Sequence, residues 1–249
     1  KPEDEAAAWY ALAKELEDLG EHAESFDALA EGASRKRATL TYDVGNECAS
    51  MQKICEAYTA EAIAAPSPGC DEEGAIFIVG MPRSGTTLVE RMLVQSGKVK
   101  AAGELMDFGN LLGIATQKVI DAQPARTQAE ASLGIDFAAL GRDYLCGARQ
   151  HADGNALFID KMPVNFLYCG MIAKALPAAK IIHLVRDPLD SCYAVFKTLF
   201  FNSYSFSYDQ LELAEYYIAY RRMMSHWHQV MPGRILDVRY EELVADVAG

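Results

Sequence analysis

The segment IFIVGMPRSGTTLVERML, residues 76–93, decides the fold of this chain. It begins with an apolar run, continues through a turn between Gly80 and Gly85, and ends with helical spacing. A strand, a glycine-bounded loop and a helix in this order are typical of an anion-binding cradle, because loop amides and the positive end of the helix face one ligand. A nucleoside-triphosphate loop has lysine directly after its second glycine, whereas this chain has Thr86 there and its cation, Arg83, inside the loop. The segment therefore predicts an anion site of another kind.

Beyond this segment, the chain alternates short apolar runs with helical stretches. Continuous apolar runs between helices indicate an α/β fold, a P-loop-like parallel sheet flanked by helices. In such sheets ligands bind beyond the carboxyl ends of the strands, so the ends at Gly80, Asp160 and Val185 should form one site. The predicted strands are 75–80, 157–160, 180–185 and 234–238, and the predicted helices lie near 87–96, 107–121, 136–150, 165–176, 188–200, 209–229 and 240–247.

The first part of the chain has a different pattern, with apolar residues at helical spacing and a break at Gly20. Trp9, Leu12 and the Leu-Gly break resemble one tetratricopeptide repeat, two short helices packed as a hairpin. An ordinary helical hairpin without repeat ancestry is the alternative. We predict a TPR-like hairpin plus a connecting helix over 1–65, a Pro- and Gly-containing linker, and an α/β domain over 74–249, with a C-terminal truncation left open.

Composition restricts the function classes. The net charge is −12, and residues 1–73 hold 6 Lys and Arg against 17 Asp and Glu, which leaves the remainder near neutral. An acidic surface repels polyanions, so nucleic acid is not expected as a partner. No apolar run is long enough for a membrane helix and no signal pattern opens the chain, which predicts a cytoplasmic protein and leaves open whether further residues precede Lys1. The six scattered cysteines and the histidines lack metal-ligand spacing, so we expect reduced thiols and no metal.

The anion loop, together with a second segment, resembles the sulfotransferases that use 3′-phosphoadenosine 5′-phosphosulfate (PAPS), especially the protein-tyrosine type and its tetratricopeptide-linked bacterial relatives. The loop matches the family's Pro-Arg-Ser-Gly-Thr-Thr, which binds the 5′-phosphosulfate. The resemblance thus implies donor contacts from the five residues Arg83, Ser84, Gly85, Thr86 and Thr87.

The second segment is KIIHLVRDPLDSCYAVF, residues 180–196, a strand ending in Arg-Asp-Pro before a helix. The resemblance implies that Arg186 binds the 3′-phosphate. The family's serine at this phosphate falls on Ala194, so Ser191 is carried in its place, with Lys197 as another substitute. A later Tyr-Glu-x-Leu match implies that Tyr240 contacts the donor.

Sulfuryl transfer needs an in-line hydroxyl nucleophile, a base for its proton and positive charge at the leaving phosphate. The resemblance implies a catalytic carboxylate, for which Glu104 is the candidate and Asp107 the reserve, since the family's own position holds Leu105. It also implies that Lys161 stabilises the transition state together with Arg83. The acceptor is open among a peptide tyrosine, a sugar and a small molecule, and the helical segment is a possible site for a protein partner.

Two other functions remain open from the sequence. A nucleotide kinase or NTPase would use Asp160, at the end of LFID, to hold magnesium. A degenerate sulfotransferase domain acting as a binding module would account for Leu105 and Ala194, which depart from the family pattern.

Overall fold

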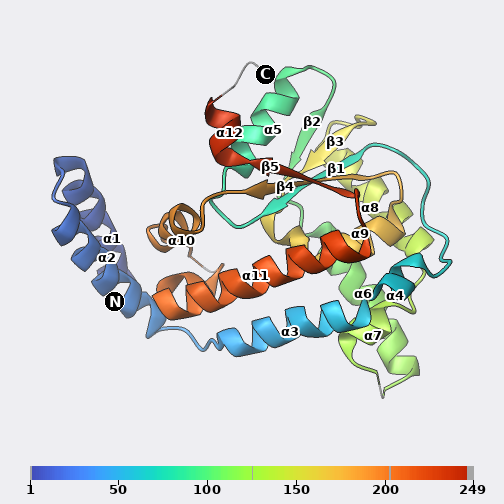
Figure 1. Ribbon diagram of the computed structural model, residues 1–249, viewed down its shortest axis with the longest axis horizontal. Helices are drawn as coiled ribbons and strands as arrows, with labels where there is room; N and C mark the ends of the chain where they lie inside the picture. The colour runs from blue at the N-terminus through green and yellow to red at the C-terminus, as the bar shows by residue number, and fades with distance from the viewer. Residues whose placement is uncertain (1, 125, 202, 246–249) are drawn as a thin grey trace. The chain divides into compact units, whose positions relative to one another are not determined.

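The structure is a computed structural model that describes residues 2–124, 126–201 and 203–245 (Figure 1). The chain forms two compact units. One comprises residues 1–49 and 187–220, and the other comprises residues 50–186 and 221–249. Two helices, α3 (Val44–Ala57) and α11 (Gln210–Val230), run from one unit into the other.

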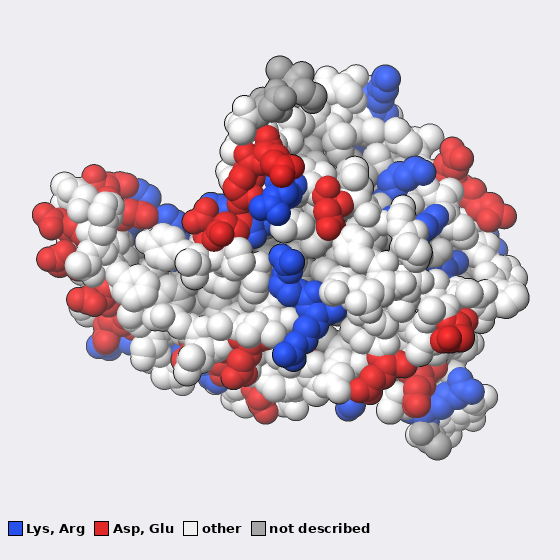
Figure 2. Space-filling view, viewed as in Figure 1, with Lys and Arg blue, Asp and Glu red and all other residues white. Residues whose placement is uncertain are grey.

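The first unit is helical. Its hairpin consists of α1 (Pro2–Leu19) and α2 (His22–Arg37), joined at Gly20, which has a φ of 83°. Acidic side chains lie over both helices (Figure 2). The unit also holds α10 (Pro188–Phe196) and the short 3₁₀ helix η2 (Ser205–Tyr208). The Tyr10 hydroxyl donates to the Phe196 carbonyl at 3.2 Å, so the hairpin packs on a segment far away in sequence.

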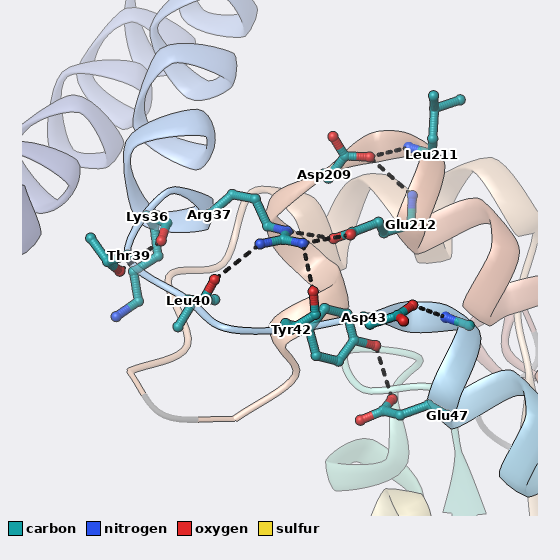
Figure 3. A network of polar contacts seen from close by, with 11 residues as sticks. Lys36, Arg37, Thr39, Leu40, Tyr42, Asp43, Glu47, Asp209, Leu211 and Glu212 are labelled. Carbon is teal, nitrogen blue, oxygen red and sulfur yellow. Dashed lines mark hydrogen bonds and ion pairs between the residues drawn. The ribbon is translucent and has the colours of Figure 1, made fainter.

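Arg37 forms the main polar connection within this unit (Figure 3). Its guanidinium donates two hydrogen bonds to Glu212 at 2.7 and 2.8 Å, and two more to the carbonyls of Leu40 and Tyr42. A planar guanidinium satisfies such a set because its donors are fixed in a fork. Arg37 thus joins the end of α2, the following turn and α11.

The second unit contains a sheet of five parallel strands in the order β2-β3-β1-β4-β5. The strands are β1 (Ala75–Gly80), β2 (Lys100–Gly103), β3 (Phe158–Asp160), β4 (Lys180–Val185) and β5 (Ile235–Arg239). Phe77 is paired with Asp160 and Gly80 with Leu184. The carboxyl ends of the three middle strands, β3, β1 and β4, therefore lie on the same side of the sheet, where the strands end.

Helices cover both faces of the sheet (Figure 1). Residues alternate between the faces along a strand, so β1 sends Ile78 into a cluster with Val89 and Ile159, while Phe77 stacks on Tyr144 with ring centroids 5.4 Å apart. The helices of this unit are α4 (Ala60–Ala64), α5 (Thr86–Gln95), α6 (Asp107–Ala122), α7 (Gln128–Ser132), α8 (Phe137–His151), η1 (Pro163–Tyr168), α9 (Cys169–Ala175) and α12 (Tyr240–Ala245).

The predicted α/β fold is confirmed, with four local corrections. Strand β2 and helix α7 were not predicted. The helix expected at 165–176 is a 3₁₀ turn followed by α9, and the helix expected at 188–200 ends at Phe196. The end of the helix expected at 240–247 lies outside the described residues.

The two compact units do not follow the predicted division at the 65–74 linker, because residues 187–220 join the N-terminal hairpin. That division and the repeat ancestry of the hairpin stay predictions. None of the described helices has the length and apolarity needed to cross a bilayer.

Candidate active site

The anion loop between β1 and α5 has the backbone that its glycines predict. Gly80 and Gly85 have φ values of 151° and 106°, and Arg83 is held at 63°, where L-residues are uncommon. The loop is thus a fixed structure that ends in the N-terminus of α5. Unpaired amides at a helix N-terminus and the helix dipole favour an anion there.

Tyr240 and Arg186 close over this loop. A Cβ added to Gly85 would lie 2.5 Å from Cδ2 of Tyr240, so the ring rests directly on the glycine. The Arg186 guanidinium lies 4.7 Å from the centre of that ring, and its Nη1 donates to the Arg83 carbonyl at 3.2 Å. The structure therefore brings together in one cluster four residues that distant motifs predicted separately: Arg83, Gly85, Arg186 and Tyr240.

Within the loop, Ser84 has a polar atom that the protein leaves unsatisfied. Its side chain is 1% exposed, and among the described residues its Oγ has no hydrogen-bond partner. A buried hydroxyl without a partner is costly, and a ligand in the loop would satisfy it. The two threonines differ, since Thr86 is buried and Thr87 is exposed.

A second polar group lies at the adjacent strand ends. Lys161 directly follows β3, and its amide donates to the Gly103 carbonyl at the end of β2 at 2.8 Å. Its ammonium forms an ion pair with Glu104, and the two side chains are 10% and 50% exposed. Two of the three residues predicted to be catalytic are thus in direct contact.

Sequence reasoning missed Glu90, on the first turns of α5. Its Oε1 is buried and, among the described residues, has no hydrogen-bond partner. Burial raises the pKa of Glu90, the nearby Lys161 ammonium lowers it and Glu104 raises it. The only sequence signal was a charged residue one helical turn after Thr86, which is equally typical of a solvated helix face.

The surroundings of Asp160 are those of a residue that stabilises the fold. Its carboxylate is fully buried and accepts four hydrogen bonds, from the Tyr144 hydroxyl, the Asn165 amide and two backbone amides, those of Leu105 and Met162. Burial raises the pKa of Asp160 to about 6, against the lowering effect of these hydrogen bonds. A carboxylate occupied in this way is unsuited to hold magnesium.

The proposed substitutes for the family serine belong to the other compact unit. Ser191 is buried in α10, a helix capped by Asp187, whose side chain accepts from the amides of Leu189 and Asp190. Lys197 forms an ion pair with Glu17 at 2.9 Å within that unit. The role of Ser191 at the donor stays a prediction.

Three side chains, two histidines and an aspartate, meet beside β5. His183 Nδ1 and His228 Nε2 lie 2.8 and 3.0 Å from the same Asp237 oxygen, and their potential ligand atoms all lie within 4.8 Å. Burial lowers the pKa of His183. The hydrogen bonds to Asp237 are sufficient to explain why the two histidines lie beside it. These bonds connect β4, β5 and the end of α11.

The order of the strands explains how the cations come together. The loop with Arg83 follows β1, Lys161 follows β3 and Arg186 follows β4, and β1 lies between the other two strands. All three strands are parallel, so the three residues lie at the same edge of the sheet. The arrangement offers fixed positive charge on both sides of an anion-binding loop.

Comparison with known proteins identifies the family of the chain. A family model described as "Sulfotransferase family" matches residues 75–249. An uncharacterized protein of Aquifex aeolicus (strain VF5) is 30% identical over an alignment of 251 positions, gaps included, that covers 97% of this chain but only 33% of that protein. The chain thus spans about a third of that relative.

Solved structures with a similar fold include two bacterial proteins. The sulfotransferase domain of the Synechococcus PCC 7002 olefin synthase has a TM-score of 0.47 at 20% identity, covering 74% of this chain and 71% of that one. A sulfotransferase from Alicyclobacillus acidocaldarius has a TM-score of 0.45 at 18% identity, covering 70% and 76%. The family match covers more than half of the chain, and the chain belongs to the sulfotransferase family.

Proposed function

We propose that this protein transfers a sulfuryl group from PAPS to a hydroxyl acceptor by in-line displacement. The observation that carries the proposal is the cluster in which Arg186 and Tyr240 close over the loop of Arg83 and Gly85. The Arg186 guanidinium, a second arginine within the loop itself and a helix N-terminus suit a ligand with two separate anionic groups, as PAPS has.

The residues present fit this donor. The loop amides, Ser84 Oγ and the hydroxyls of Thr86 and Thr87 would hold the 5′-phosphosulfate, and Arg83 would neutralise it. Arg186 would bind the 3′-phosphate and Tyr240 would pack against the nucleotide. Ser84 supports this assignment because its buried hydroxyl has no partner among the described residues.

Glu104 and Lys161 would perform the chemistry. Glu104 is half exposed, which leaves it accessible to an acceptor hydroxyl as a general base. Lys161 would place its charge at the bridging oxygen, where negative charge develops as the bond to sulfur breaks. The transfer step proposed here uses no metal ion.

Titration calorimetry tests the donor site. Adenosine 3′,5′-bisphosphate, the product left after transfer, should bind in the presence of EDTA, and ATP with magnesium should give no comparable heat. Arg83→Ala and Arg186→Met should each weaken bisphosphate binding about tenfold or more, because each removes charge-assisted hydrogen bonds. Arg142→Ala, on the exposed side of α8, is the matched control and should bind as the wild type does.

The same experiment separates the alternatives. Magnesium-dependent ATP binding would favour a nucleotide kinase, which the buried and fully hydrogen-bonded Asp160 already disfavours. Binding of neither nucleotide would favour a degenerate domain that acts as a binding module.

The acceptor stays open among a peptide tyrosine, a sugar and a small molecule. A screen of these hydroxyl compounds with PAPS would follow once the bisphosphate binds. Glu104→Gln should then retain bisphosphate binding and lose turnover, since it removes the proton acceptor together with its ion pair to Lys161.

A further inference from the structure

The group formed by His183, His228 and Asp237 has the composition of a metal site. His183 Nδ1 and His228 Nε2 lie 2.8 and 3.0 Å from Oδ1 of Asp237, and the three atoms all lie within 4.8 Å of one another. Two imidazole nitrogens and a carboxylate oxygen form a ligand set that zinc takes in proteins. The histidines precede Asp237 by 54 and 9 positions, so no short sequence motif reveals the set.

Regular secondary structure positions each of the three side chains. His183 in β4 and Asp237 in β5 are register partners on adjacent strands, so the pleat directs both to the same face of the sheet. His228 lies in the last turn of α11, where the negative end of the helix dipole favours a cation. All three residues belong to the same compact unit. Ligands on strands and helices are held more precisely than ligands on loops.

The separations and the exposure of the three side chains also suit zinc. Zinc bonds of about 2.0–2.2 Å place the ligand atoms of a tetrahedral site about 3.3–3.5 Å apart, so each histidine nitrogen would move only about 0.5 Å from Asp237 Oδ1. His183 is 3% exposed, whereas His228 and Asp237 are 35% and 47% exposed. The protein therefore encloses one side of the group, and water can complete the coordination from the other side.

We propose that His183, His228 and Asp237 bind a zinc ion that joins β5 to β4 and α11. Zinc takes the place of the proton in each contact between a histidine and Asp237, and that proton passes to the other ring nitrogen or to solvent. The site has no part in the sulfuryl transfer step and does not depend on the proposed function.

The position of β5 indicates what the ion would stabilise. β5 is the last strand of the sheet within the described part of the chain, with β4 as its neighbour. Tyr240, whose ring rests on the anion loop, directly follows β5. An ion bound to β5, β4 and α11 would therefore hold in place the strand that leads to Tyr240.

Titration calorimetry with zinc chloride tests the site. The full chain, reduced and then freed of metal by EDTA and dialysis, is compared with His228→Asn and Asp237→Asn. Both positions are partly exposed, and Asp237→Asn retains an oxygen that accepts hydrogen bonds, so both variants should fold. His151→Gln, which removes an exposed histidine at the end of α8, is the control.

The expected result is one tight zinc site in the wild type and in His151→Gln. Each ligand variant should bind zinc at least about tenfold more weakly, because changes even in the residues around metal ligands cost about 10–100-fold. Magnesium and calcium prefer oxygen ligands and should give no comparable heat. Wild-type zinc affinity in either ligand variant would overturn the proposal, as would the absence of zinc binding to the wild type.

Amide hydrogen exchange shows where the zinc is bound. At a zinc concentration of about 100 times the Kd, local opening that breaks the site becomes up to about a hundredfold rarer. Zinc should therefore slow the exchange of residues 235–239 in the wild type and have little effect on them in Asp237→Asn. Zinc held elsewhere, for example by the exposed Cys146, would leave this segment unchanged and would overturn the proposal. Neither experiment uses the donor, so the proposed function is tested separately.

Discussion

Replacing Gly85 by alanine should disrupt the donor site from within the loop. The new Cβ would lie 2.5 and 2.8 Å from two carbons of the Tyr240 ring, well inside the separation of about 3.5–4.0 Å at which carbon atoms attract each other. The ring must therefore move by about 1 Å, away from the position in which it stacks with Arg186. The backbone cost is separate, because Gly85 has a φ of 106°. Alanine in such a conformation costs about 1–3 kcal/mol.

A double-mutant cycle separates these two effects. Gly85→Ala is made in the wild type and in Tyr240→Ala, and both urea unfolding and bisphosphate calorimetry are measured. The backbone strain should lower the free energy of unfolding by about 1–3 kcal/mol in either background. The loss of bisphosphate affinity, about tenfold in the wild type, should be much smaller when Tyr240 is already absent, because contacting residues couple by about 0.5–3 kcal/mol. Additive losses of affinity would refute the contact of the tyrosine with the loop as the cause.

Three further predictions concern stability. The pKa of Asp160 is raised by burial to about 6, so its contribution to stability is complete below pH 4 and is lost as pH rises through 6. The free energy of unfolding should fall by about 3 kcal/mol over that window, and urea unfolding of Asp160→Asn should lack this slope. Arg37→Met removes two hydrogen bonds to Glu212 and two to backbone carbonyls, and should lower the melting temperature with a loss of about 1–2 kcal/mol; an unchanged value would contradict the network's role. Trp227→Phe leaves the Phe166 carbonyl without its 2.9 Å partner and should cost about 2 kcal/mol or more in urea unfolding, whereas a neutral result would show that the site repacks.

The parts of the fold that the sequence predicts best are those with strong local signals. Strands β1 and β4 have the predicted bounds, since β1 is a continuous apolar run that ends at Gly80 and β4 is a mostly apolar run that Arg186 follows. Strand β2, with the sequence Lys-Ala-Ala-Gly, has no β-branched or aromatic residue and is not fully buried. It forms because its backbone pairs with β3, which is a tertiary contact that local propensity does not encode.

The site residues, like the strands, could be predicted only where the local sequence signal is strong. The loop residues 83–87 were predictable because glycine positions fix backbone geometry wherever they occur. Glu90 was not, because a charged residue on an amphipathic helix indicates solvent until the packing of α5 is known. Residues 187–220 were assigned to the α/β domain by chain order, whereas their compact unit depends on contacts with α1 and α2 that no local pattern reveals.

The strand order determines the orientation in which the donor would bind in the proposed site. Lys161 lies on the β3 side of the loop, and Arg186 lies on the β4 side. The two phosphate positions of PAPS are on opposite sides of its ribose, so one cation cannot bind both. A 3′-phosphate at Arg186 turns the 5′-phosphosulfate toward β3, where Glu104 pairs with Lys161. The reverse orientation would present the sulfuryl group to Arg186 and leave Glu104 and Lys161 beside a phosphate that does not react. The proposed chemistry therefore requires Arg186 to act mainly in donor binding and Lys161 mainly in the rate of transfer.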